Sequence, residues 1–256
     1  MSGMRAVAIP VCLAAAGLAA LAAGCAATGP GAPGPALPVY ACRRVDRDLV
    51  LSGKADDPLW QQAEAVALSE PVGGRPNRYR TSARLLYNGR FLYVAFDCED
   101  EYVWGTHDRR DAPIYEQECV EAFLCPSEKT RQYYEINVSP RNAVFDAVIL
   151  NGRSAPDGAG AFTGLSQYTC EGLVTQVHVR GGLGVKGAGG WSAEFAIPFA
   201  SIPGADDPVP KPGDAWRFNL YRIDSPEPPA LEFYAWSPTG ANDYHRPWRF
   251  GWLRFE

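Results

Sequence analysis

Short apolar segments separated by turn residues recur along most of this chain, and they constrain its fold more than any other feature. The clearest pair is Arg84–Tyr87 and Phe91–Phe96, which flank Asn88-Gly89. Asn-Gly between two apolar runs is the strongest short-range signal for a β-hairpin, because both turn residues must accept a positive φ. The segment Trp191–Ile197 alternates apolar and polar residues, as a strand with one buried face does. These patterns predict neighbouring β-strands that share a core.

Helix signals are almost absent. The only helix-like stretch is short, around Asp57–Ala65, where Pro58 is tolerated in the first turn. Many short strands with Gly/Pro-rich turns indicate a sandwich or barrel. We therefore expect an all-β fold, an antiparallel, jelly-roll-like β-sandwich with little helix. Further strands are expected at Val120–Cys125, Tyr133–Val138, Ala143–Leu150, Leu173–Arg180, Trp191–Ile197, Trp216–Ile223, Glu232–Ser237 and Phe250–Phe255.

Residues 1–24 are predicted to be a secretory signal. Arg5 is the only charge before an Ala-rich apolar run that is too short to span a bilayer well. Leu21-Ala-Ala-Gly-Cys25 resembles the bacterial lipobox, which implies that Cys25 is lipidated, although Leu21 lies one residue further from Cys25 than is usual. Ala26 is not the Asp that retains such proteins in the inner membrane, so we expect an exported protein anchored in the outer membrane. An ordinary signal peptide with an incidental Cys is the alternative.

Residues 25–40 are predicted to be a linker, because a stretch rich in Ala, Gly and Pro cannot form a core. The folded part is then 41–256, a length that fits one large sandwich better than two domains. The chain has a formal net charge of −5 at pH 7 and no run of five or more basic residues. Nucleic-acid binding is therefore not expected, since it depends on a basic surface.

Five cysteines follow Cys25, and an exported protein meets conditions in which disulfides form. An odd number leaves at least one thiol free, and the sequence alone does not select the pairing. The chain has no CxxC motif and no Cys/His cluster, which argues against structural zinc. The five residues are Cys42, Cys98, Cys119, Cys125 and Cys170.

A set of ordered segments carries a resemblance to a known family. Each segment alone is a weak signal, and their shared order across about residues 46–256 is a strong one. They are Leu51–Trp60, Leu86–Asp100, Ile114–Leu124, Trp191–Pro198, Arg217–Arg222, Ala235–Pro238 and Arg249–Gly251. Together they resemble the family 9 carbohydrate-binding modules and their family-9-like relatives.

The resemblance implies a β-sandwich that sometimes binds calcium and that holds the end of a glycan chain between two tryptophans. Those tryptophans correspond here to Tyr115 and Tyr244, which keep a flat ring and add a hydroxyl group. The acids of the family's site correspond to Asp100 and Glu121, and an amide corresponds to Asn137. The expected partner is therefore an oligosaccharide or polysaccharide.

Two departures weaken this correspondence. Glu135 stands near the position of an arginine that binds sugar in the family, and Ala241 stands where a loop asparagine is found. Each proposed ring could also cover core at the edge of the sandwich, and each acid could be a surface group or the partner of an arginine. A scaffold protein of the cell envelope that has lost sugar binding therefore remains an alternative.

Two further hypotheses concern covalent and metal bonds. Cys98 and Cys119 each lie two residues before one of the candidate acids, and residues two apart in a strand share a face. If the acids share one site, a Cys98–Cys119 disulfide could form beside it. Calcium, which prefers several hard oxygen ligands, could bind the acidic run of Asp97, Glu99, Asp100 and Glu101. A solvated turn is the alternative for that run.

Catalysis is not expected. The chain lacks the Gly-x-Ser-x-Gly, HExxH, P-loop and dinucleotide motifs, and a catalytic carboxylate pair of a glycoside hydrolase cannot be placed from one sequence. Haem would need axial His or Met ligands. The only histidines are His107, His178 and His245, and no methionine follows the predicted signal. We therefore expect a non-catalytic carbohydrate binder, with a glycoside hydrolase accessory or a haem-binding domain as weaker alternatives.

Overall fold

The computed structural model describes residues 36–127, 130–153, 161–203 and 209–256. These residues form thirteen strands and four short 3₁₀ segments. No described helix is long and apolar enough to cross a membrane. The predicted signal, lipobox and most of the linker lie outside the described residues. The strands are β1 (Val39–Arg44), β2 (Val66–Ala67), β3 (Thr81–Tyr87), β4 (Phe91–Cys98), β5 (Cys119–Cys125), β6 (Gln132–Val138), β7 (Val144–Asn151), β8 (Phe162–Leu165), β9 (Val174–Val179), β10 (Trp191–Pro198), β11 (Ala215–Asp224), β12 (Glu232–Ala235) and β13 (Gly251–Phe255).

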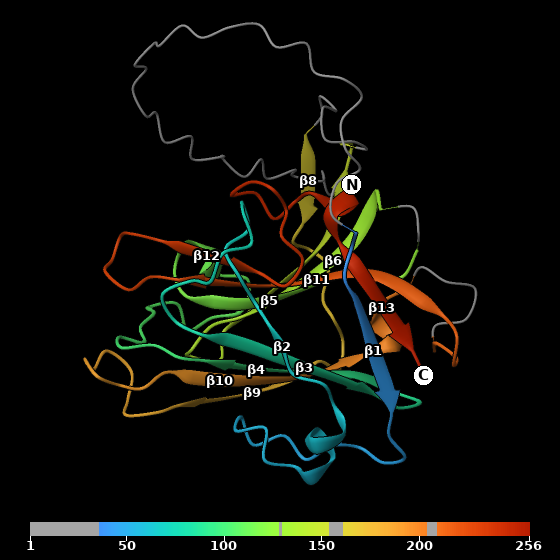
Figure 1. Cartoon of the computed structure of the whole chain (residues 1–256), viewed down its shortest axis with the longest axis horizontal. Coiled ribbons are helices and arrows are strands. Elements are labelled where there is room, and N and C mark those ends of the chain that lie inside the picture. The colour runs from blue at the N-terminus through green and yellow to red at the C-terminus, as the bar shows by residue number, and fades with distance from the viewer. Residues whose placement is uncertain (1–35, 128–129, 154–160, 204–208) are drawn as a thin grey trace, which may run out of the picture.

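The strands form two layers that lie face to face (Figure 1). Sheet A has the order β8-β7-β6-β5-β11-β13, with β12 added to one end of β11, and sheet B has the order β3-β4-β10-β9, with β2 on β3. Strand β1 joins them, because its first part pairs with β13 and its last two residues pair with β3. Both pairings of β1 are parallel, so the sheet is mixed. The prediction of an all-β sandwich with little helix is confirmed.

Alternation along the strands builds the main core between the layers. Val120, Ala122 and Leu124 of β5 face inward, toward the inner side chains of β3, β4 and β10. The intervening residues of β5 face the outer side of sheet A, where a second apolar cluster forms under η2 (Ile114–Glu116) and the loop before β13. Both faces of sheet A are therefore covered, and β5 is buried along its whole length.

The outer face of sheet B carries a third, smaller cluster. Here η1 (Pro58–Gln62) places Trp60 against the sheet, and the Trp60 Nε1–H donates to Glu194 at 2.8 Å. The Asp57 carboxylate caps η1 by accepting from the backbone N–H of Leu59 at 2.9 Å. The predicted helical stretch around Asp57–Ala65 is thus one short 3₁₀ segment.

The hairpin between β3 and β4 forms as predicted, but its turn differs from the expected one. Neither Asn88 nor Gly89 has a positive φ, so the expected Asn-Gly turn geometry is wrong. The Asn88 side chain instead accepts from the backbone N–H groups of Arg90 and Phe91, at 2.8 and 2.9 Å. This side-chain turn moves the reversal one residue along the chain, a role that Asn supports well.

Candidate glycan-binding pocket

A pocket of about 320 Å³ opens on the outer face of sheet A. Its floor comes from β5, β6 and β11, and its walls come from η2, β8, β12 and the loop after β12. Rings and acids alternate around it, which is the composition expected of a site that stacks a pyranose and bonds its hydroxyls. The lining residues are Tyr115, Glu121, Phe123, Glu135, Arg153, Phe162, Ile223, Phe233, Asn242, Asp243, Tyr244 and His245.

The two-residue period of the strands explains how acids reach this floor. Val120 and Ala122 fill the core, so Glu121 and Phe123 must face the opposite side. Glu135 reaches the same side from the adjacent strand β6. Alternation along two adjacent strands therefore brings both carboxyl groups into one pocket.

Tyr115 and Tyr244 line this one pocket although they lie far apart in the sequence. Tyr115, on η2, is half-buried and packs edge-on against Phe145, with ring centroids 5.1 Å apart. Both residues therefore border one cavity, but only Tyr115 presents a half-buried ring to it.

The expectation that Tyr244 exposes its ring is wrong. The residue is only 8% exposed, and its ring stacks on Tyr221 with centroids 3.9 Å apart. Its hydroxyl donates to the carbonyl of Arg222 at 2.7 Å and accepts from the N–H of Tyr234 at 3.0 Å. Tyr244 therefore ties β11 to β12 and offers the pocket only part of its surface. A tyrosine ring on a loop can thus pack into the core, because its hydroxyl group pairs with backbone groups that neighbouring strands leave unpaired.

Glu121 and Glu135 form the polar end of the pocket, and Asn137 is buried behind them without lining it. Glu121 and Asn137 are direct cross-strand partners on β5 and β6. The Asn137 amide donates to Glu135 at 2.8 Å, and the Cys119 thiol donates to Glu121 at 3.3 Å. Burial raises the pKa of Glu135 to about 7, and burial together with the nearby Glu135 raises the pKa of Glu121 well above its usual value. The pair thus holds a proton at neutral pH.

The opposite wall contains residues that sequence reasoning did not single out. The imidazole of His245 stacks on Phe162, with centroids 3.7 Å apart, and Nδ1 lies 2.8 Å from the Tyr133 hydroxyl. Burial lowers the pKa of His245 to about 3, so the ring is neutral. Arg153 pairs with Asp243 at 2.7 Å. Asp243 and His245 directly flank Tyr244 in the chain, and this was the only signal in the sequence for part of this wall.

Asp100 does not belong to the pocket. It lies on the other side of sheet A, where its carboxylate accepts from Arg222 at 2.8 Å and from the N–H of Tyr102 at 2.7 Å. Arg222 follows Tyr221 in β11, so the alternation of the strand sends the two side chains to opposite faces. The expectation that Asp100 and Glu121 share one site is wrong, and Asp100 has the role of an arginine partner.

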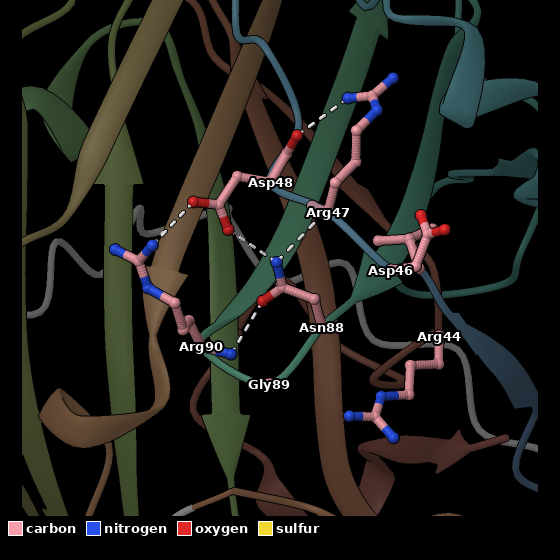
Figure 2. Close-up of a pocket in the computed structure, with 8 residues that line it drawn as sticks. Arg44, Asp46, Arg47, Asp48, Asn88, Gly89 and Arg90 are labelled. Carbon is pink, nitrogen blue, oxygen red and sulfur yellow. Dashed lines mark hydrogen bonds and ion pairs between the residues drawn. The ribbon is translucent and has the colours of Figure 1, made fainter.

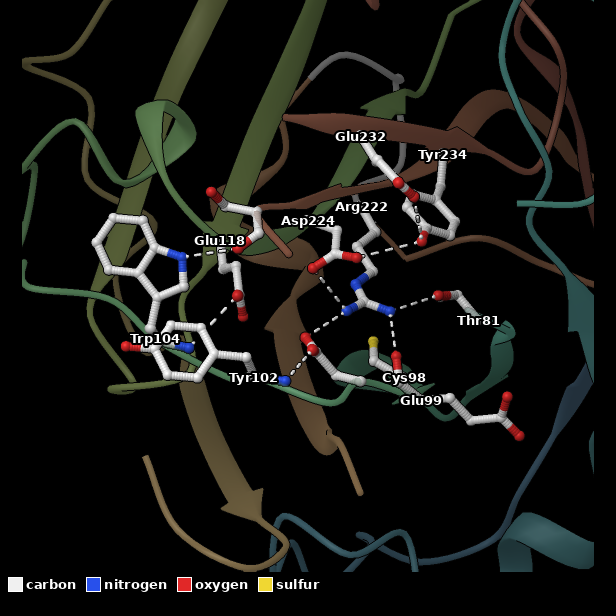
Figure 3. A network of polar contacts seen from close by, with 12 residues as sticks. Thr81, Cys98, Glu99, Tyr102, Trp104, Glu118, Arg222, Asp224, Glu232 and Tyr234 are labelled. Atoms are coloured by element: carbon white, nitrogen blue, oxygen red, sulfur yellow. Dashed lines mark hydrogen bonds and ion pairs between the residues drawn. The ribbon is translucent and has the colours of Figure 1, made fainter. Parts of the chain in front are cut away.

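Arg222 is the centre of a buried network (Figure 3). Its guanidinium also donates to the Thr81 hydroxyl at 3.0 Å and lies 3.2 Å from an oxygen of Asp224. Glu118 completes the group, and one of its oxygens has no hydrogen-bond partner among the described residues. Burial, followed by the charges of Asp100 and Asp224, raises the pKa of Glu118 to about 10.

The carboxylates of the predicted acidic run do not converge on one point. Asp97 pairs with Arg180 and Glu99 with Arg80, each at 2.8 Å, so these side chains point to different partners. A different set fits a divalent cation better. Single oxygens of the three buried acids of the network lie within 4.8 Å of one another, and carboxylate oxygens are the ligands that calcium prefers. The residues that could hold calcium are Asp100, Glu118 and Asp224.

The predicted Cys98–Cys119 disulfide is absent, and the five described cysteines are free thiols. Cys98 is buried in the core between the sheets, whereas Cys119 is buried in the cluster on the outer face of sheet A. The hypothesis assumed that the two acids share a site. Because Asp100 and Glu121 lie on opposite sides of sheet A, the thiols of Cys98 and Cys119 lie on opposite sides of it as well.

A larger groove of about 620 Å³ lies beside the β3–β4 turn (Figure 2). Several of its charges are already paired, since Asp48 accepts from Arg90 and from the Asn88 amide, both at 2.8 Å. Arg47 likewise forms two bonds of 2.8 Å with Asp57. No aromatic side chain lines this groove, so the smaller pocket on sheet A is the better ligand site.

Solved structures share the fold. A protein of Bacteroides uniformis described as a candidate carbohydrate-binding protein is 19% identical, with a TM-score of 0.65, and the match covers 86% of this chain and 100% of that one. A family 9 carbohydrate-binding module from Caldicellulosiruptor kristjanssonii is 13% identical. Its glucose complex has a TM-score of 0.60, and the match covers 86% of this chain and 96% of that one. Its cellotriose complex has a TM-score of 0.59, and the match covers 86% of this chain and 94% of that one. No match was found among the curated proteins.

The model of one protein family, described as carbohydrate family 9 binding domain-like, matches residues 51–256. The match spans most of the chain and includes every strand except β1. It confirms the family resemblance of the ordered segments and agrees with a binding role rather than catalysis. The chain therefore belongs to the carbohydrate family 9 binding domain-like family.

Proposed function

We propose that the pocket on sheet A binds the end of a glycan chain without cleaving it. The observation that carries the proposal is the convergence of Tyr115, Tyr244 and Glu121 on one cavity in a chain of this family. A volume of about 320 Å³ is near the lower end of the range for small-ligand sites, roughly 300–1,000 Å³. That size suits one or two sugar units, and the related modules were solved with glucose and cellotriose.

The geometry suggests how a pyranose is held. Tyr115 presents a half-buried ring, and Phe233 and Phe162 present two more around the same cavity. The apolar face of a sugar can stack on such rings, while its hydroxyls donate to the carboxyl groups of Glu121 and Glu135. A hydrogen bond to a charged group contributes roughly 1.5–3 kcal/mol. Because Tyr244 is stacked on Tyr221, we assign most of the stacking surface to the three half-buried rings.

Tyr115→Ala is expected to weaken glycan binding about tenfold, a loss of about 1.4 kcal/mol, because it removes a stacking surface without touching a backbone hydrogen bond. Isothermal titration calorimetry with glucose, cellobiose, xylobiose and chitobiose measures the change. Tyr79→Ala is the matched control, since Tyr79 is a partly exposed ring outside the pocket. Tyr244→Ala is a poor test, because it also leaves the backbone groups of Arg222 and Tyr234 unpaired.

Wild-type binding by Tyr115→Ala would contradict stacking on this ring. The absence of binding to any glycan in the panel and in a wider glycan array would contradict the proposed function. It would favour the alternative of an envelope scaffold on a family 9 fold.

We also propose that Cys25 is lipidated and anchors the domain at the bacterial cell envelope, in the outer membrane. The support is the lipobox-like segment that ends at Cys25 and the following Ala/Gly/Pro-rich spacer. Radiolabelled palmitate fed to expressing bacteria should label the wild type and Cys12→Ala, and it should not label Cys25→Ala. Equal labelling of Cys25→Ala and the wild type, or no labelling of either, would exclude this anchor.

A further inference from the structure

We propose that the pocket prefers glycans whose terminal unit carries a free amino group, that is, hexosamine ends of the deacetylated type. The inference rests on the proposed function and names the ligand class of the same pocket. It follows from an excess of hydrogen-bond acceptors and of negative charge at one end of the cavity.

Two carboxyl oxygens in the pocket lining lack a donor among the described residues, and an amide oxygen without a partner is buried behind them. The Oδ1 atom of Asn137 is buried without a partner, because the amide nitrogen of the same side chain is used on Glu135. Glu121 receives its recorded hydrogen bond, from Cys119, on Oε1, so Oε2 is free. The Oε2 atom of Glu135 lies 4.0 Å from His245 Nε2, which is too far for a hydrogen bond.

These acceptors lie on one face of two adjacent strands. Glu121 and Asn137 are paired directly across β5 and β6, and Glu135 is two residues from Asn137 on the same face. An ammonium group has three N–H donors and no acceptor, so it can donate to the carboxyl groups of Glu121 and Glu135 at once. A hydroxyl group offers only one donor and would leave acceptors unpaired, which is costly in a buried site.

The charge of the lining also favours a cation. The pocket contains three acids, Glu121, Glu135 and Asp243. Arg153 is the only basic side chain among the described lining residues other than His245, and it is paired with Asp243 at 2.7 Å. The buried His245 is neutral. Without a ligand, desolvation raises the pKa of both glutamates, so the pair holds a proton that a bound ammonium group has to displace.

The same features disfavour other sugar classes. A uronic acid would bring a further carboxylate toward Glu121 and Glu135, with no unpaired cation in the described lining to receive it. An N-acetylated hexosamine keeps one N–H donor but loses the positive charge. A neutral hexose can use the rings and donate hydroxyl hydrogens to the glutamates, but it brings no positive charge to them. Recognition therefore depends on the amino group, while the rings contribute to binding of every class.

Calorimetric titration of the purified full chain with four monosaccharides tests the preference. Glucosamine is expected to bind at least tenfold tighter than glucose and N-acetylglucosamine, and glucuronate is expected to bind weakest. Glu135→Gln should weaken glucosamine binding more than glucose binding and bring the two affinities to within about twofold of each other. Glu64→Gln, which removes one exposed acid outside the pocket, should keep the full preference.

The outcomes separate this inference from the proposed function. Equal affinity for glucosamine and glucose in the wild type would overturn the amino-sugar preference and leave glycan binding in place. An undiminished preference in Glu135→Gln would overturn the assigned acceptor cluster. No binding of any of the four sugars, or of the longer glycans, would overturn the proposed function itself. Because the comparison of ligands uses the wild-type protein, it holds even where a variant folds poorly.

Discussion

Arg222→Met is expected to lower the free energy of unfolding by about 3–5 kcal/mol, the largest loss of any single substitution considered for this protein. The reason is that Arg222 is fully buried beside Asp100 and Asp224, at 2.8 and 3.2 Å. Methionine fills a similar volume but leaves the carboxylates without their counter-charge. Such a loss is a large fraction of the total stability of a typical domain, about 5–15 kcal/mol.

Urea denaturation followed by tryptophan fluorescence measures the change. Arg80→Met is the matched control, because Arg80 forms an ion pair of 2.8 Å with Glu99 while its side chain is 74% exposed. Exposed pairs contribute about 0–1 kcal/mol, so the control should unfold almost as the wild type does. Equal effects of the two substitutions would contradict the description of Arg222 as the centre of a buried network.

Glu118→Gln is expected to stabilise the protein, on the order of 3 kcal/mol at pH 8 in the presence of a chelator. Burial and two neighbouring acids raise the pKa of Glu118 to about 10, so at pH 8 folding must keep a proton on this group. Glutamine has nearly the same shape and needs no proton. Its carbonyl can still accept from the N–H of Trp104, which lies 3.3 Å from Glu118.

The pH dependence of this gain has a defined sign. A carboxyl group whose pKa is raised by folding makes its full contribution to stability below its usual pKa of 4.5 and loses it as the pH rises toward 10. The advantage of Glu118→Gln should therefore be absent near pH 4 and grow by about 1.4 kcal/mol for each pH unit above 4.5, less any relaxation of the site.

Thermal or urea unfolding of both proteins between pH 4 and pH 9 provides the test. Glu116→Gln, in which the replaced acid is exposed, should match the wild type throughout. A stability difference that does not change with pH would contradict the buried, protonated state of Glu118. Adding calcium tests whether these acids form a cation site. If Asp100, Glu118 and Asp224 hold this ion, millimolar calcium stabilises the wild type and reverses the advantage of the variant.

Much of the fold was predictable because strand periodicity is local. The alternation of Trp191–Ile197 and the two runs around Asn88 identified β10 and the β3–β4 hairpin to within three residues. Strands β1, β2 and β8 were missed. Two of these are short, and β1 follows a Pro-rich stretch and pairs only with strands distant in the sequence.

The candidate site was predictable only in part. The family pattern brought Tyr115, Tyr244 and Glu121 to one pocket, because ordered motifs preserve which strand and which face a residue occupies. It misplaced Asp100, whose partner Arg222 is more than a hundred residues away along the chain. It also missed Phe162 and Arg153, which reach the pocket only because β7 and β8 complete the end of sheet A.

The amino-acid sequence by itself determined the class of fold, the hairpin and the family, since apolar alternation, turn residues and motif order act over a few residues at a time. The tertiary structure alone decided that Tyr244 stacks on Tyr221, that Cys98 and Cys119 face different cores, and that Asp100 meets Arg222. Each of these contacts depends on which side of sheet A a side chain faces and on what packs there. That choice is made by strands far apart in the chain when the two layers come together.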